Sequence, residues 1–159
     1  MAEAFSNKVA RAAGIVTSYS GSTVAAGSTA ITVTALTGIG VSFLVDNQHF
    51  IAGTKVVSTS PVSGGVGTVF TDRNSTNTSS ASSQTVRFLG PTTAYTSAAS
   101  TKSVIIGGTF ANNTSNSVNL TVEVYDTSVG VTSTGSVAIA SKIPVPAGSS
   151  FVISDTGKT

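Results

Sequence analysis

The chain has 159 residues, of which 26 are Ser and 25 are Thr, and its 8 basic and 6 acidic side chains give a net charge of +2. Charged residues make up 9% of the chain, well below the roughly 25% of ordinary soluble domains. The basic residues are scattered singly, which argues against a nucleic-acid binder, and the absence of cysteine excludes disulfides and thiolate sites. Hydrophobic residues make up 40% and recur in strand-like alternation, which favours a folded chain over a disordered one.

Residues 1–22 are predicted to form an N-terminal arm with a short helix over about residues 2–13. Four apolar residues recur there at helical spacing: Phe5, Val9, Ala12 and Val16. Gly14 disfavours continuation of the helix, and the run TSYSGSTVAAGST that follows is predicted to be a flexible link. The chain contains neither the apolar run of a secretory signal nor the 18 or so apolar residues of a membrane span. We therefore expect no membrane partner.

Beyond the arm, short strand candidates alternate with turn-rich segments. A first β module is expected over residues 23–90, a linker over 91–101 and a second β module over 102–159. The strands are predicted at 29–36, 41–46, 55–59, 67–71 and 84–90 in the first module and at 102–110, 117–126, 136–142 and 150–154 in the second. Many short strands without helices between them predict an all-β fold of one or two small antiparallel β-sandwich modules, Ig-like or jelly-roll-like.

Alternating residues in the second module predict which side chains form its core. The clearest alternation places Val118, Leu120, Val122 and Val124 on one face of a strand. The predicted core comprises Val104, Ile106, Val122, Val124, Val137, Ile139, Phe151 and Ile153. The polar runs DRNSTNTSSASS (72–83) and NNTSNS (112–117) are predicted to be exposed tips of a β scaffold. Such tips are either solvated loops or surfaces that contact a partner.

No catalytic, cofactor-binding or metal site is predicted. His49 is the single histidine; a catalytic triad would have to pair it with Asp46 and a serine, yet no Gly-x-Ser-x-Gly turn is present. One histidine without cysteine cannot form a zinc site, and residues 72–77 lack the acidic density of a calcium loop. The terminal GKT lacks the glycine that a P-loop requires where Val152 stands. We expect no enzymatic activity.

Uncharged strands in a chain so poor in charge predict association. Solubility usually relies on charge, and strand edges without charged side chains invite pairing with other chains. We therefore expect the edges and apolar patches to be buried against copies of this chain or a larger body.

Three segments resemble small virion structural proteins of tailed bacteriophages, of the type found in cyanophages. They are SFLVDNQHFIAGTKVVST, TKSVIIGGTFANNTSNSVNLTVEVYD and SKIPVPAGSSFVISDTGKT. The shared patterns are V-x-N-Q-x-F-x-x-G-T-K-V, I-x-G-x-x-x-A-N, V-x-V-Y and I-P-V-P-x-G-S-S, and the resemblance covers most of residues 30–159. It implies a non-enzymatic virion protein that folds in the host cytoplasm and assembles as a neck, collar or capsid decoration subunit. The alternative is a tail-fibre or receptor-binding adhesin module, which the scarcity of aromatic residues disfavours.

The implied partners are other copies of the chain and other virion proteins of the capsid, portal, neck or tail, with no direct nucleic-acid contact. The interface candidates are Phe5, Lys8, Val9 and Arg11 as an anchor, Asn112 and Asn113 at a tip, and Phe151 and Ile153 in the last strand. Proteins of the resembling type continue past GKT with one or two further strands. We therefore expect the second module to be open and completed by strand addition from a neighbouring chain.

Overall fold

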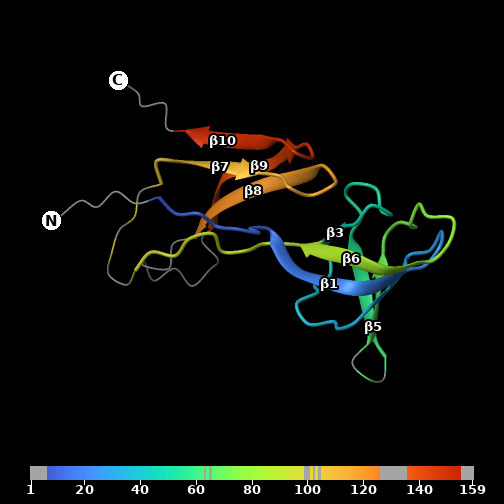
Figure 1. Ribbon diagram of the computed structural model, residues 1–159. Helices are drawn as coiled ribbons and strands as arrows, with labels where there is room; N and C mark the ends of the chain where they lie inside the picture. The colour runs from blue at the N-terminus through green and yellow to red at the C-terminus, as the bar shows by residue number, and fades with distance from the viewer. Residues whose placement is uncertain are drawn as a thin grey trace. The chain divides into compact units, whose positions relative to one another are not determined.

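The structure is a computed structural model that describes residues 7–62, 64, 66–98, 101, 103, 105–125 and 136–154. Its ten strands form antiparallel sheets, and the described residues contain no helix (Figure 1). The prediction of an all-β, antiparallel fold is therefore confirmed. The chain divides into two compact units, unit 1 (Met1–Ile105) and unit 2 (Ile106–Thr159).

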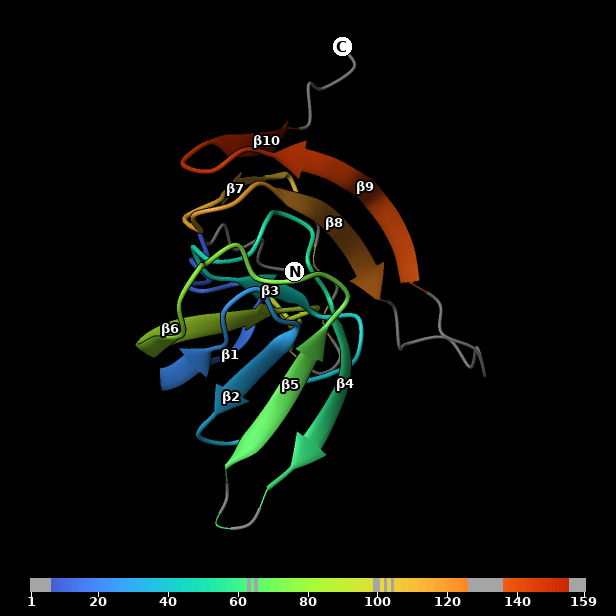
Figure 2. The same ribbon diagram turned by 90° about the vertical axis from the view of Figure 1, so that its right-hand side faces the viewer.

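Unit 1 consists of one antiparallel sheet of six strands. In chain order the strands are β1 (Ile15–Val24), β2 (Ala30–Val33), β3 (Leu44–Asp46), β4 (Val56–Pro61), β5 (Gly67–Thr71) and β6 (Ala81–Leu89). Their order in the sheet is β3-β6-β1-β2-β5-β4. Figure 2 shows β2, β5 and β4 side by side, with β4 outermost. The strands predicted at 41–46, 55–59, 67–71 and 84–90 correspond to β3, β4, β5 and β6.

The sheet of unit 1 curls until the start of β4 meets β3. Leu44 forms a β-bridge with Lys55, which immediately precedes β4. The Val56 carbonyl accepts a hydrogen bond from the Ser42 amide at 2.8 Å, and the Val56 amide donates to the Phe43 carbonyl at 2.9 Å. These bonds pair the first part of the outermost strand and leave the rest of β4 as an edge.

A core of large apolar side chains fills the inside of the curled sheet. Its buried members are Val24, Ile31, Val33, Val45, Phe50, Val56, Val69, Val86 and Phe88. Tyr19 packs on the core, with its ring edge-on to Phe88 at a centroid distance of 6.5 Å. The inner face thus collects the β-branched and aromatic residues of every strand, and its burial is the main source of stability for this unit.

The helix predicted over about residues 2–13 is absent from its described part, and residues 15–22 of the predicted arm belong to a strand. Residues 7–10 have no regular structure, residues 11–14 form a turn, and Ile15–Val24 is strand β1. The register between β1 and β6 shifts three times, and Gly21 has a φ of +75°. These bulges disrupt the two-residue alternation that identifies a strand, so the segment resembled a flexible link.

The polar run 72–83 is largely exposed, as predicted, but Ser75 and Asn77 anchor it to its own unit. The buried Ser75 donates its amide hydrogen to the Ser28 carbonyl at 2.9 Å and its hydroxyl to the Ala25 carbonyl at 2.6 Å. Asn77 donates its side-chain amide to the Val24 carbonyl at 3.1 Å. The run therefore caps the β1–β2 turn, and β6 begins at Ala81.

Unit 2 contains two separate two-stranded sheets. One pairs β7 (Gly107–Ala111) with β10 (Ser150–Ser154), and the other pairs β8 (Val118–Tyr125) with β9 (Ser136–Val145). All four strands were predicted, and residues 150–154 match β10 at both ends. Because each sheet has only two strands, every strand of this unit is an edge strand within its own sheet.

Candidate functional site

The most exposed apolar surface of unit 2 lies on one face of the β8–β9 sheet. Val118 lies opposite Val145, Leu120 opposite Ile143, and Val124 opposite Val137, and opposite residues of an antiparallel pair share a face. Two bulges in β9 keep these pairs on the same face: two residues face Thr121, and Ile139 is an extra residue between the pairs Val122–Ala140 and Glu123–Ala138. We call this face the β8–β9 strip; it comprises Val118, Leu120, Val122 and Val124 with Val137, Ala140, Ile143 and Val145.

Burial falls steadily along the β8–β9 strip. Val145 is 3% exposed, and its partner Val118 is half-buried. At the other end, Val124 is 40% exposed and Val137 is 70% exposed, and the bulge residue Ile139 beside them is 51% exposed. None of the eight side chains of the strip carries a charge. The apolar face is therefore covered at one end and open to solvent at the other.

The prediction that Ile106, Val124, Val137 and Ile139 form a core is wrong, because all four are exposed. Val122, Phe151 and Ile153 are half-buried, and Val104 lies outside the described residues. Alternation assigns side chains to one face of a strand, but it does not show whether another layer covers that face. The exposed end of the strip is thus a surface that sequence reasoning missed.

The candidates Phe151 and Ile153 lie in β10 on its half-buried face. Phe151 is opposite Phe110 and Ile153 is opposite Gly108, and all four residues are half-buried. Their side chains therefore form the partly covered face of the β7–β10 sheet. The exposed apolar residue of β10 is Val152, which is 59% exposed.

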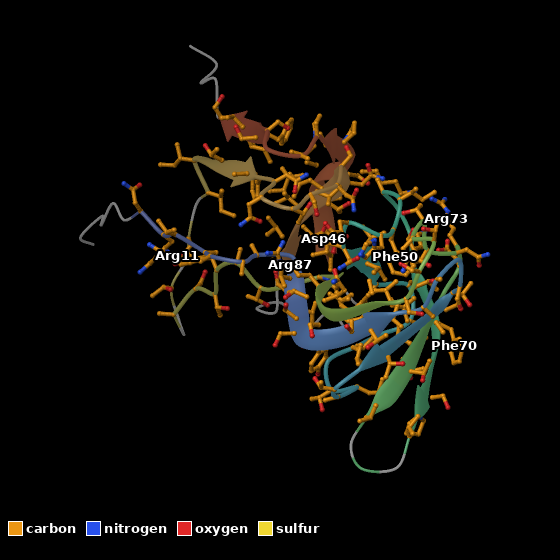
Figure 3. The ribbon with its side chains drawn as sticks, turned by 45° about the vertical axis from the view of Figure 1, so that its right-hand side comes forward. Arg11, Asp46, Phe50, Phe70, Arg73 and Arg87 are labelled. Carbon is orange, nitrogen blue, oxygen red and sulfur yellow. The ribbon has the colours of Figure 1, made fainter. Side chains whose placement is uncertain are left out.

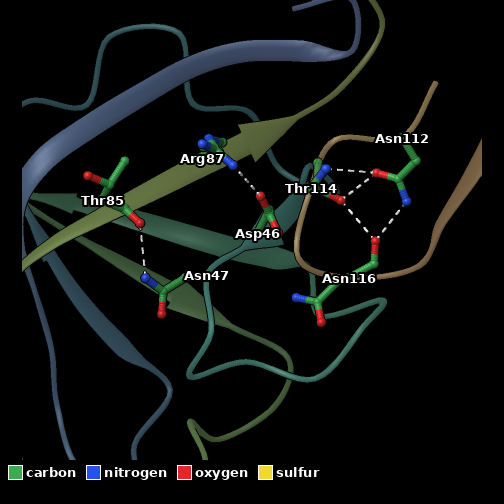
Figure 4. Close-up of polar contacts among 7 residues, drawn as sticks. All are labelled: Asp46, Asn47, Thr85, Arg87, Asn112, Thr114 and Asn116. Atoms are coloured by element: carbon green, nitrogen blue, oxygen red, sulfur yellow. Dashed lines mark hydrogen bonds and ion pairs between the residues drawn. The ribbon is translucent and has the colours of Figure 1, made fainter. Parts of the chain in front are cut away.

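Asn112 is buried, which corrects the expectation that its side chain is displayed at a tip. Its side-chain amide donates to the carbonyls of Asn116 and Val145, each at 2.9 Å. Its Oδ1 accepts from the Thr114 amide at 3.0 Å and the Thr114 hydroxyl at 2.7 Å (Figure 4). Its backbone is bonded to Ser149 and Gly148. Asn113 is exposed.

Asn112 therefore ties the β7–β8 turn to the β9–β10 turn. Both turns carry patterns of the resemblance, since I-x-G-x-x-x-A-N ends at Asn112 and I-P-V-P-x-G-S-S spans residues 143–150. Gly148, in the second pattern, has a φ of +70° and donates its amide hydrogen to the Asn112 carbonyl at 3.0 Å. These patterns thus fall on residues that fix the geometry of the turns.

The pattern V-x-N-Q-x-F-x-x-G-T-K-V of unit 1 falls on the connection between β3 and β4, in which Asn47, Phe50 and Thr54 are buried. The side-chain amide of Asn47 donates to the Thr85 carbonyl at 2.9 Å (Figure 4). Phe50 belongs to the core, and the buried Thr54 donates its hydroxyl to the Ile51 carbonyl at 2.8 Å. Gly53 has a φ of +84°, a conformation that favours glycine.

At the start of this connection, the buried carboxylate of Asp46 forms an ion pair with the partly exposed Arg87. Asp46 Oδ2 lies 3.2 Å from Arg87 Nη1, and the two residues are opposite each other in β3 and β6 (Figure 3). The Asp46 side chain is 2% exposed and that of Arg87 is 40% exposed. The Asp46 carboxylate is thus engaged by Arg87, while the His49 ring contacts the side chain of Gln48 at 3.4 Å.

The remaining interface candidates lie before β1. Lys8, Val9 and Arg11 are exposed, and Val9, at 84%, is the most exposed large apolar residue among those described. Arg11 lies at the start of the described chain in Figure 3. Phe5 lies outside the described residues. The described anchor candidates therefore lie in unit 1, whereas the Asn112, Asn113, Phe151 and Ile153 candidates lie in unit 2.

Among the residues that the structure describes, no three acidic or histidine side chains gather as a metal-binding group. The calcium alternative for 72–77 is further weakened because Asp72 Oδ1 accepts the Lys55 amide at 2.7 Å. No helix capable of crossing a membrane is found in the described parts of the chain. Comparisons of the chain with protein-family models, with curated proteins and with solved structures find no match.

Proposed function

We propose that this chain is a non-enzymatic structural subunit of a bacteriophage virion that assembles with copies of itself and with other virion proteins. Its place is a neck, collar or capsid decoration layer. The observation that carries the assembly function is the open end of the β8–β9 strip, where Val124 and Val137 are exposed on an uncharged face next to the exposed bulge residue Ile139. The virion context rests on the resemblance of the turn and strand patterns.

The energetics of the strip favour burial by another chain. Fully burying a valine side chain contributes about 1.5–3 kcal/mol, so covering the exposed parts of Val124 and Val137 supplies roughly 2 kcal/mol to an interface. The face continues from the covered residues Val118 and Val145. A neighbouring subunit that packs there therefore extends an apolar layer that the chain has already begun.

The strand arrangement of unit 2 supports the same proposal. Two-stranded sheets are marginally stable in water, and three or more strands or a packed layer are needed for independent stability. Unit 2 has two such sheets, and all four of its strands have an unpaired side in them. Packing of the two sheets as a small sandwich, completed by a neighbouring chain, would satisfy both the faces and the edges.

The assembly proposal is tested by the mass of the full-length chain in solution, measured by light scattering. Val137→Lys places a charge on the strip, and Ala138→Lys places the same charge one residue away on the opposite face of β9. We expect wild type and Ala138→Lys to form the same discrete oligomer. Val137→Lys is expected to shift the protein to a smaller species while its circular dichroism stays unchanged. Equal masses for all three proteins would contradict an interface at the strip.

The virion context has its own test. Antibodies against the chain are expected to label particles purified from lysates of the host that carries its gene, at a regular position seen by electron microscopy. A neck or decoration subunit follows the symmetry of its particle, whereas a fibre gives an elongated trimer. Particles without the chain would exclude the virion assignment and leave the assembly result standing.

A further inference from the structure

The outermost strand of unit 1 presents a second surface for association, independent of the β8–β9 strip. β4 ends the sheet order, and all residues from Val57 to Pro61 are exposed. The curled sheet pairs the chain only as far as Val56, through its bonds to Ser42 and Phe43. A bulge at Val57 and the proline at 61 limit the free edge at its two ends. The free edge is thus a window of five residues.

The hydrogen-bonding groups of this window can be placed from the β4–β5 register. The Val62 amide donates to the Val66 carbonyl at 2.8 Å, which makes this pair the hydrogen-bonded pair nearest the turn. Hydrogen-bonded and non-hydrogen-bonded pairs alternate in an antiparallel ladder. Thr59, opposite Val69, therefore belongs to a non-hydrogen-bonded pair. Its N–H and C=O point away from β5, toward the open side of the sheet.

The residue types of the window, Val57–Pro61, follow nearly the same order from either end. The sequence is Val-Ser-Thr-Ser-Pro, an apolar residue at each end, a serine inside each end and Thr59 at the centre. An antiparallel pairing of two copies about a twofold axis at Thr59 places Ser58 opposite Ser60 and Val57 opposite Pro61. A twofold interface needs such self-complementarity, because each residue meets its counterpart in the other copy.

We infer that a second copy of this chain pairs with β4 along Val57–Pro61, antiparallel and about a twofold axis at Thr59. The two Thr59 residues exchange both of their backbone hydrogen bonds, as a hydrogen-bonded pair does. No charged side chain lies in the window, so the pair has no like-charge repulsion of the kind that protects other edges. The bulge and Pro61 end the pairing after a few residues, which closes it as a dimer rather than extending it.

The inference is tested by charge placement in the full-length chain, with sedimentation velocity as the readout over a range of concentrations. Ser58→Lys with Ser60→Lys puts like charges opposite each other twice, whereas Ser58→Lys with Ser60→Glu puts opposite charges there. Both serines are exposed, so unchanged circular dichroism and unfolding midpoints are expected. We expect the two-lysine variant to raise the dissociation constant of the pair roughly tenfold or more. The lysine–glutamate variant is expected to retain wild-type affinity or bind more tightly.

Repeating the two charge variants of β4 in a Val137→Lys background distinguishes association through the β4 edge from association through the β8–β9 strip. Loss of pairing only in the two-lysine variant supports the inference. Loss in both charge variants contradicts the antiparallel register, because a parallel register would bring like charges together in each. Equal association of all variants, or a monomer at every concentration, overturns the inference. An effect of Val137→Lys without an effect at β4 would leave the proposed function intact.

Discussion

The strands of the two units enclose apolar side chains to different extents. Unit 1 curls one six-stranded sheet until Leu44 bridges to Lys55, and the curl encloses nine buried apolar side chains. Unit 2 divides its four strands between two sheets, and among its described residues Val145 is the one buried apolar side chain. The contrast shows that similar strands give an enclosed core only where the sheet is wide enough to curl over its own face.

The polar contacts of the two units also differ in what they hold together. In unit 1 the polar groups at Ser75 and Asp46 sit around an apolar core that already holds the sheet. In unit 2 the hydrogen bonds of Asn112 join two turns of a unit that encloses little apolar surface. Unit 2 therefore depends more on its turns, and on whatever covers the β8–β9 strip, than unit 1 does.

The largest expected effect is in the core of unit 1. Phe88→Ala removes a fully buried ring, and such a change costs about 3–5 kcal/mol of unfolding free energy. Phe151→Ala in unit 2 removes a half-buried ring and is expected to cost about 1–2 kcal/mol. Urea unfolding of both variants, followed by circular dichroism, measures the difference. Equal losses would mean that the two units are packed alike.

A smaller effect is expected at the ion pair of unit 1. Arg87→Met leaves the carboxylate of Asp46 buried without this cation, and we expect a loss of about 1–3 kcal/mol because Arg87 is partly exposed to solvent. The matched control is Arg73→Met, which breaks an exposed pair with Asp72 at 4.0 Å and an exposed hydrogen bond to the Ala52 carbonyl at 3.2 Å and should change stability by less than about 1 kcal/mol. A control as damaging as Arg87→Met would show that charge loss alone, and not burial, sets the cost.

The smallest of these effects is expected in the turns of unit 2. Asn112→Ala removes the side-chain bonds to Asn116, Thr114 and Val145 and should cost about 1–2 kcal/mol. Asn113→Ala changes an exposed neighbour and should have almost no effect. Amide hydrogen exchange in β7 and β10 measures both. The dependence of unit 2 on its turns would be refuted by unchanged exchange in the Asn112 variant.

Local pattern was sufficient to predict much of the fold. The strands at 67–71 and 150–154 match β5 and β10, because turn-forming residues border short apolar-alternating runs. β1 was missed because its bulges and Gly21 disrupt the alternation. The exposure of Val137 and the burial of Asn112 were missed for a different reason. Both depend on which distant segments meet, and neither alternation nor composition contains that information.

We expect unit 1 to be stable by itself and unit 2 to be stabilised by association. Hydrogen exchange of the full-length chain, measured by mass spectrometry at low and at high protein concentration, tests this expectation most directly. We predict that amides of β8 and β9 gain protection as the concentration rises, while core strands β2 and β5 of unit 1 exchange at the same slow rate throughout. Concentration-independent protection of β8 and β9 at the level of β2 and β5 would show that unit 2 is stable without association.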